Sequence, residues 1–235
     1  MINAKVAFRC LVAFLLISSA ASMIFDRHAT AAAQRTVQEQ LEAKLEKQYA
    51  TIEDLFLHGP AKLVFPADPR QRLLRWQDDL AQGFADAGAT IDEILRLQPH
   101  DEERWRERRE TMLLYSKPTG PPANRTVFGS SEVQKKARMV NAPAAAYTTE
   151  ARAAKAKGEV RLRLVLAADG TVKNIFPMKP LKYGLTEAAM EAARQIKFEP
   201  AIRNGQPASQ FATLSYEFKK GQGLAPYFPE HEFYF

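Results

Sequence analysis

The side chains that most often carry chemistry are few in this chain, and they are scattered. The four histidines are His28, His58, His100 and His231. Zinc-binding histidines usually lie at short, regular intervals, and no such interval occurs here. The sequence also lacks the Gly-x-Ser-x-Gly motif of serine hydrolases and the glycine-rich motifs that hold nucleotide phosphates. We therefore predict a protein that is not an enzyme and that has no metal ion and no cofactor; an enzyme with an unrecognised site is the least favoured alternative.

A dense run of charge, DEERWRERRE, spans Asp101 to Glu110. Glu102 and Arg106 lie four residues apart, as do Arg106 and Glu110, so on a helix their charges screen each other. We interpret the run as the solvated face of a helix. The formal net charge of +6 is not gathered in one long basic segment, which argues against nucleic acid as a partner.

The C-terminal tail, GLAPYFPEHEFYF, runs from Gly223 to Phe235 and contains five aromatic residues. One interpretation is that it folds back over an apolar patch of its own domain, where it could occupy an edge strand. The other is that it is an exposed docking segment for a partner or a membrane surface, because exposed aromatic clusters usually mark interaction sites.

The first 33 residues have the pattern of an export signal. Lys5 and Arg9 precede a short apolar run at 10–17, and small residues follow up to Ala33. We predict a signal peptide or signal anchor over 1–33 and favour cleavage, because the apolar stretch is short for a membrane-spanning helix. Cys10 is the only cysteine, so a cleaved chain would contain no disulfide.

Residues 34–115 predict a small helical module. Apolar residues recur at helical spacing, and N-terminal caps are expected at three positions: Asp68, Thr90 and Asp101. Gly88 is expected to end the second helix. Trp76 and Trp105 fall on the apolar stripes, so we predict that both belong to the core.

A proline-rich segment, SKPTGPPANR at 116–125, predicts a linker, and the apolar periodicity changes after it. Apolar and charged residues alternate in GEVRLRLVLAADGTVKNI, from Gly158 to Ile175, with an Asp-Gly turn signal, which is typical of a β-hairpin. A third strand is expected over 210–218, and helices over 150–156 and 185–196. The segment 126–220 thus predicts an α+β sandwich, followed by an aromatic tail at 221–235.

Several motifs in this segment resemble the C-terminal domain of the TonB family. They are Tyr147, Ala151-Arg152, Gly158-Glu159-Val160, LVLAADGTV, Gly184-Leu185, AARQIKFEPAIRNGQPASQ and LSYEF, within about 126–219. The resemblance implies a periplasmic domain in which two helices pack on a three-stranded antiparallel sheet. It also implies that an extended peptide of an outer-membrane transporter, or of another envelope protein, binds the sheet by strand addition, in which main-chain hydrogen bonds supply most of the affinity.

The resemblance assigns the peptide-binding edge to the last strand. Its expected residues are Gln210, Phe211, Ala212, Thr213, Leu214, Ser215 and Tyr216. Phe211, Thr213 and Ser215 would lie on the face away from the covering helices. In the energy transducers of the family, inner-membrane proton-driven motor proteins supply force through such a peptide.

Three features differ from these transducers. Tyr147 is followed by threonine where the family usually has proline, a helical module replaces the long proline-rich spacer, and the apolar N-terminal run lacks the histidine of a motor-contacting anchor. The alternative is therefore a soluble periplasmic scaffold or self-associating module without motor coupling, and a homodimer is left open.

Overall fold

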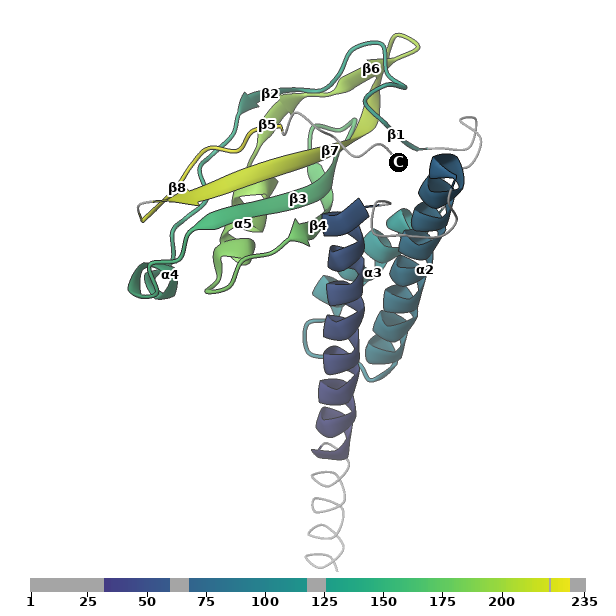
Figure 1. Cartoon of the computed structure of the whole chain (residues 1–235), viewed down its shortest axis with the longest axis vertical. Coiled ribbons are helices and arrows are strands. Elements are labelled where there is room, and N and C mark those ends of the chain that lie inside the picture. Colours follow the sequence, from purple (N-terminus) through teal and green to yellow (C-terminus); the bar gives the residue numbers. More distant parts are fainter. Residues whose placement is uncertain (1–31, 60–67, 118–125, 220, 229–235) are drawn as a thin grey trace, which may run out of the picture.

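A computed structural model describes residues 32–59, 68–117, 126–219 and 221–228. A group of long helices stands beside a curled sheet that carries two shorter helices (Figure 1). The predicted signal segment lies outside the described residues except for positions 32 and 33, and so does most of the predicted linker, 118–125. Within the described ranges, no helix combines the length and the apolar character needed to cross a membrane.

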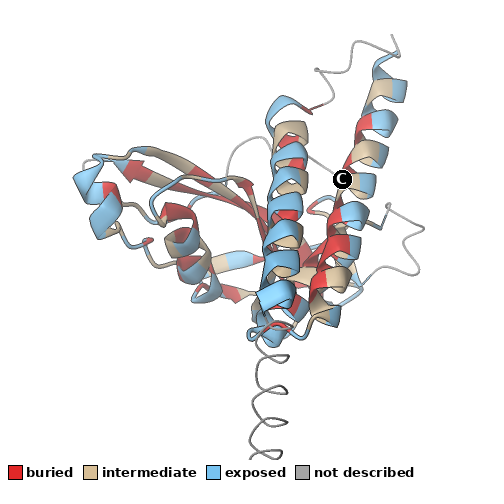
Figure 2. Cartoon of the chain, turned by 90° about the horizontal axis from the view of Figure 1, so that it is seen from below, coloured by how far each residue is buried: buried red, intermediate tan, exposed pale blue. Residues whose placement is uncertain are grey.

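Three helices form what we call the helical module: the N-terminal helix at 32–58, α2 (Pro69–Arg96) and α3 (Glu102–Tyr115). Helix α2 begins as predicted, because the Asp68 side chain accepts a hydrogen bond from the Arg70 backbone N–H at 2.9 Å and Pro69 follows the cap. Buried residues form inward-facing stripes along the helices (Figure 2). Trp76 and Trp105 are both in this core, as predicted.

The predicted break at Gly88 is wrong, because α2 continues through it to Arg96. A Cβ at Gly88 would lie 3.5 Å from the Cβ of Met112 in α3, so the glycine stands where two helices approach each other closely. Packing across this contact outweighs the low helix propensity of one glycine.

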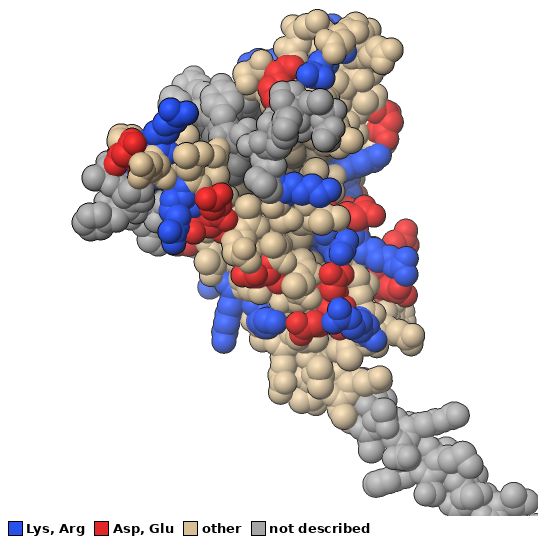
Figure 3. Space-filling view, turned by 90° about the vertical axis from the view of Figure 1, so that its right-hand side faces the viewer, with Lys and Arg blue, Asp and Glu red and all other residues tan. Residues whose placement is uncertain are grey.

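The charge run of α3 is largely a solvated face, as predicted. Arg106 pairs with Glu102 one turn away at 2.5 Å, whereas Arg109 reaches across to Asp92 of α2 at 2.9 Å. On the face shown in Figure 3, acidic and basic side chains are interspersed over the helices. The described surface there presents no extended area of one sign.

The sheet has more strands than the three predicted. The strands are β1 (Val127–Phe128), β2 (Arg138–Asn141), β3 (Gly158–Leu166), β4 (Val172–Lys179), β5 (Lys197–Glu199), β6 (Ala201–Arg203), β7 (Gln206–Lys219) and β8 (Gln222–Gly223). Their order is β1-β7-β3-β4; β6 and β8 also pair with β7, and β2 pairs with β5 separately. The predicted strands are β3, β4 and β7. The sheet is mixed and not purely antiparallel, because β1 runs parallel to β7.

One face of the sheet is covered by α4 (Thr149–Ala153) and α5 (Leu185–Arg194). Small residues on α5 allow a close approach, and Ala189 and Ala193 are fully buried. The alternating residues of β3 that predicted the hairpin, Val160, Leu162, Leu164 and Leu166, are all fully buried beneath these helices. Each contributes roughly 1.5–3 kcal/mol through its burial. Gly184 stands at the N-cap of α5, and the Thr186 hydroxyl donates a hydrogen bond to the Leu181 carbonyl.

The helical module packs against the opposite face of the sheet, at β4. Phe176 and Met178 of β4 belong to the buried core of the module. The ring of Phe176 lies 5.1 Å from that of Phe84 and 5.7 Å from that of Tyr49. The Tyr115 hydroxyl also donates a 2.8 Å hydrogen bond to the Asn174 carbonyl. The sheet thus lies between two layers of helices.

Candidate functional site

All seven residues expected at the peptide-binding edge lie in β7. This strand pairs with β3 without interruption from Gly158↔Phe218 to Leu166↔Gln210. Ala212, Leu214 and Tyr216 are buried beneath α5, whereas Phe211, Thr213 and Ser215 face the other side of the sheet. The division of the strand into two faces is the one expected from the sequence.

The outer edge of β7, the edge that faces away from β3, is partly occupied by other parts of the chain. Strand β1 pairs with Ser209 and Gln210 at one end, and β8 pairs with Phe218 and Lys219 at the other. Ser215 pairs with Tyr227 of the C-terminal tail. Among the described residues, no strand is registered opposite the stretch from Phe211 to Leu214. Ala212, Thr213 and Leu214 are nonetheless buried, at 2% exposed or less, so this stretch has no strand partner among the described residues but is not exposed.

The direction of the backbone groups follows from the pairing of Ser215. Ser215 donates its N–H to the Tyr227 carbonyl at 3.0 Å, and its own carbonyl accepts the Tyr227 N–H at 3.1 Å. Residues two positions apart on a strand direct these groups to the same edge. Thr213 therefore presents its N–H and its carbonyl to the outer side, where an added strand would bond.

The opposite edge of the sheet, at β4, is irregular. Asn174 has a left-handed φ of 51°, and its carbonyl is taken by Tyr115. Pro177 has no N–H to offer, and the pairing of β4 with β3 shifts register twice. Bulges and prolines are the usual means by which an edge strand avoids pairing with another chain. Of the two edges, β7 is thus the one suited to strand addition.

The stretch Phe211–Leu214 of β7 is bordered on the sheet surface by the helical module. The Phe211 ring lies 5.8 Å from that of Tyr115, and the guanidinium of Arg163 stacks 5.1 Å above the Phe211 ring. Arg163 also donates a 3.1 Å hydrogen bond to the Thr213 hydroxyl. Burial raises the pKa of Tyr115, so its hydroxyl stays protonated and can only donate to the Asn174 carbonyl.

Near Ser215 the same face carries a polar cluster centred on Glu159. Its carboxylate contacts the Lys179 ammonium at 3.1 Å and the Arg161 guanidinium at 3.2 Å. Burial alone would raise the pKa of Glu159, but the neighbouring Ser215 hydroxyl, Lys179 and Arg161 more than offset this and lower it to about 2. Glu159 is therefore ionised at neutral pH. The sequence assigned it no role beyond the hairpin.

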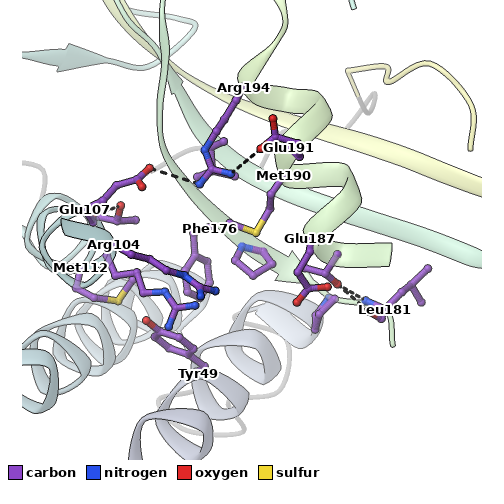
Figure 4. Close-up of a pocket in the computed structure, with 16 residues that line it drawn as sticks. Tyr49, Arg104, Glu107, Met112, Phe176, Leu181, Glu187, Met190, Glu191 and Arg194 are labelled. Atoms are coloured by element: carbon purple, nitrogen blue, oxygen red, sulfur yellow. Dashed lines mark hydrogen bonds and ion pairs between the residues drawn. The ribbon is translucent and has the colours of Figure 1, made fainter. Parts of the chain in front are cut away.

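A separate cavity of about 600 Å³ lies between the helical module and α5 (Figure 4). Phe176, Met112 and Met190 contribute apolar surface to it. At its rim Arg194 pairs with Glu107 at 3.5 Å and with Glu191 at 3.8 Å, so these charges are mutually compensated. None of the residues predicted for the peptide-binding edge lines this cavity.

The described residues contain no group of three or more metal-ligating side chains. The His58 ring donates a 3.0 Å hydrogen bond to the Asp54 carbonyl of its own helix, and His28 and His231 lie outside the described ranges. The alternation of apolar residues along β7 does not predict the pairing of Ser215 with Tyr227 of the tail. The one sequence signal for this contact was the high aromatic content of the tail.

Residues 143–219 match the family model described as the Gram-negative bacterial TonB protein C-terminal. No curated protein matches the chain. The matched residues run from just before α4 to the end of β7, and they do not include the helical module. This part of the chain is therefore a TonB-family C-terminal domain. The match suggests the role of a TonB-like protein in the cell envelope.

Proposed function

We propose that the sheet domain binds an extended peptide of an outer-membrane transporter, or of another envelope partner, in the periplasm by adding it as a strand to the outer edge of β7. The observation that carries this proposal is the contrast between the two sheet edges. Strand β7 is regular and has no strand partner at Phe211–Leu214 among the described residues, whereas β4 is interrupted by Asn174 and Pro177. Because Ala212, Thr213 and Leu214 are buried, a peptide that adds here must displace the atoms that cover them. Main-chain pairing at such an edge supplies affinity largely without regard to the sequence of the added peptide.

The test is a substitution that removes one outward backbone donor and leaves the β3 ladder in place. In Thr213→Pro the N–H that faces the outer edge is lost, and proline is tolerated where the N–H does not bond within the sheet. We expect binding of labelled peptides from transporter N-terminal segments to weaken about tenfold or more, a loss of about 1.4 kcal/mol per factor of ten. Fluorescence anisotropy measures the affinity, and circular dichroism checks that the fold is kept.

Thr213→Val is the matched control. It removes the hydroxyl that Arg163 bonds but keeps the backbone N–H, so peptide affinity is expected to stay within a few-fold of the wild type. Hydrogen exchange on the unmodified chain gives a second measurement: the Thr213 amide should become protected when a peptide binds. Equal binding by both variants, with no added protection at Thr213, would rule out this edge.

A second candidate function is supported by the packing of the helical module. The module lies against β4 through Phe176 and Tyr115 and is not a free spacer in the described residues. This arrangement favours a periplasmic scaffold or self-associating protein that acts without motor coupling. Sedimentation equilibrium of the full chain distinguishes the cases, because a stable oligomer supports self-association and a strictly monomeric chain counts against it.

A further inference from the structure

The C-terminal tail follows the outer edge of β7 as an added strand would. Strand β8 pairs Gln222 and Gly223 with the end of β7, and the Leu224 N–H then donates a 2.9 Å hydrogen bond to the Glu217 carbonyl. Tyr227 bonds Ser215 in both directions. The tail thus uses the outward groups of Glu217 and Ser215 in succession, which is the antiparallel pattern of strand addition.

The path of the tail along β7 is narrow at its start. A Cβ at Gly223 would lie 2.1 Å from the carbonyl oxygen of Ala145, so no side chain fits at this point. The tail therefore passes between β7 and the segment that precedes α4. Such a close backbone approach requires glycine, so the residue type at position 223 is matched to this path of the tail.

The side chain of Tyr227 reaches the polar cluster described above. Its hydroxyl donates a hydrogen bond to the Glu159 carboxylate at 3.3 Å, and its side chain remains 46% exposed. Burial and the nearby carboxylate raise the pKa of Tyr227, so the phenol keeps its proton and remains a donor. Glu159 is fixed in turn by Lys179 and Arg161. The position opposite Ser215 is therefore a place where a phenol is recognised.

We propose that the outer edge of β7 is a site for an extended segment with a phenol opposite Ser215, and that the chain's own tail is its resident occupant, competing with any partner peptide. The identity of the partner peptide rests on the proposed function. The assignment of the tail as the resident occupant rests on the hydrogen bonds between the tail and β7 alone. Ser215 has one N–H and one carbonyl facing outward, so it cannot pair with the tail and with a partner at once. Glu159 is the residue that selects the phenol.

The test uses the full chain and a labelled peptide with the sequence of Gln222 to Phe235. Tyr227→Pro removes the N–H that bonds the Ser215 carbonyl and should release the tail. A short tether holds the tail at an effective concentration of about a millimolar, so its release should raise the affinity for the added peptide about tenfold or more. Anisotropy measures the affinity. Faster hydrogen exchange at Ser215 in Tyr227→Pro shows the release directly.

Phe228→Ala is the control for a general effect of changing the tail. In the described part of the chain Phe228 makes no backbone hydrogen bond to β7, so this variant should bind the peptide as weakly as the wild type. Equal peptide affinity in Tyr227→Pro and the wild type would overturn the proposal. So would an unchanged exchange rate at Ser215 in Tyr227→Pro.

The role of Glu159 is tested in the Tyr227→Pro background. A peptide with phenylalanine at the position of Tyr227 should bind several-fold more weakly than the native peptide. In Glu159→Gln this preference should shrink, because the amide is a weaker acceptor than the carboxylate. An undiminished preference for tyrosine would exclude Glu159 as the selecting residue.

Transporter peptides separate this proposal from the proposed function. If the tail peptide binds Tyr227→Pro and no transporter peptide binds either form, the proposal that the tail occupies the β7 edge is supported and the proposal of a transporter partner is contradicted. If transporter peptides bind the wild type and Tyr227→Pro equally, the transporter site stands and competition by the tail is wrong.

Discussion

Glu159 is the residue whose charge state most directly affects the candidate site. Its polar neighbours are the Ser215 hydroxyl, Lys179, Arg161 and the Tyr227 hydroxyl. Its pKa of about 2 lies below the ordinary value of 4.5. A carboxylate with a lowered pKa stabilises the folded state above the unfolded pKa, and this stabilisation is lost as the pH falls from about 4.5 to about 2.

We predict that the stability difference between the wild type and Glu159→Gln depends on pH. Near neutral pH the wild type should be more stable by about 1 kcal/mol, a figure reduced to allow for solvent screening of this partly exposed group. The difference should shrink toward zero between pH 4.5 and pH 2. Urea unfolding of both proteins at several pH values measures it. A constant difference over this range would contradict the assigned pKa.

At the scale of single residues, sequence reasoning identified the two faces of β7 but not the partners of its outer edge. Alternation along LSYEF places Leu214 and Tyr216 on the face covered by the helices and Ser215 on the opposite face, and the structure agrees, although Ser215 is buried as well. The bond between Tyr227 and Glu159 joins residues 68 positions apart. No local pattern encodes such a contact, because it depends on where the tail passes after β7 ends.

Among the elements, α2 differs most from its predicted form. Two glycines, Gly83 and Gly88, lie inside a helix of 28 residues. A Cβ at Gly88 would meet Met112 at an ordinary contact distance of 3.5 Å, whereas a Cβ at Gly83 would lie only 3.0 Å from Cγ1 of Ile52 in the N-terminal helix. The two glycines therefore have different surroundings, although both interrupt the helical pattern in the sequence.

We predict different outcomes for alanine at these two positions. Gly88→Ala should stabilise the protein by about 0.5–1 kcal/mol, because alanine favours the helix and its methyl group fits. Gly83→Ala should be less stable than Gly88→Ala, since the fully buried Ile52 must move to admit the methyl group. Thermal unfolding of the two variants side by side measures this. An equal increase in stability in both variants would show that the Ile52 side chain moves aside at no energetic cost.

Short strands were the elements that the sequence did not predict. Strands β1 and β8 contain two residues each, too few to show alternation. Both pair with the outer edge of β7, whose backbone groups face away from β3. The long alternating runs in β3 and β7 were predictable because their periodicity reflects a buried face, whereas β1 and β8 depend on tertiary position.

At the scale of the whole molecule, the helical module and the sheet are joined through β4. The sequence of this strand, VKNIFPMK, is apolar on both faces. Ile175 lies in the core beneath α5, while Phe176 and Met178 lie in the core of the module. A strand that is apolar on both faces indicates cover on both sides. Sequence reasoning did not use this feature and treated the helices as a separate unit.

We predict that Phe176 makes the module and the sheet unfold together. Four aromatic rings surround its ring at 5.1 to 6.4 Å, those of Tyr49, Phe56, Phe84 and Tyr115. Phe176→Ala should cost about 3–5 kcal/mol through the cavity that it leaves. Tyr115→Phe, which removes only the bond to the Asn174 carbonyl, should cost about 1 kcal/mol and serves as the control.

The two parts of the molecule can be followed separately during this unfolding. Both tryptophans, Trp76 and Trp105, lie in the module, so their fluorescence reports on the module, and amide exchange in β3 and β7 reports on the sheet. In the wild type the two signals should be lost at the same urea concentration, because the ring of Phe176 is part of the module's core and its backbone is part of the sheet. In Phe176→Ala the tryptophan transition should come first. Separate transitions already in the wild type, or coincident ones in Phe176→Ala, would mean that this side chain does not couple the unfolding of the module to that of the sheet.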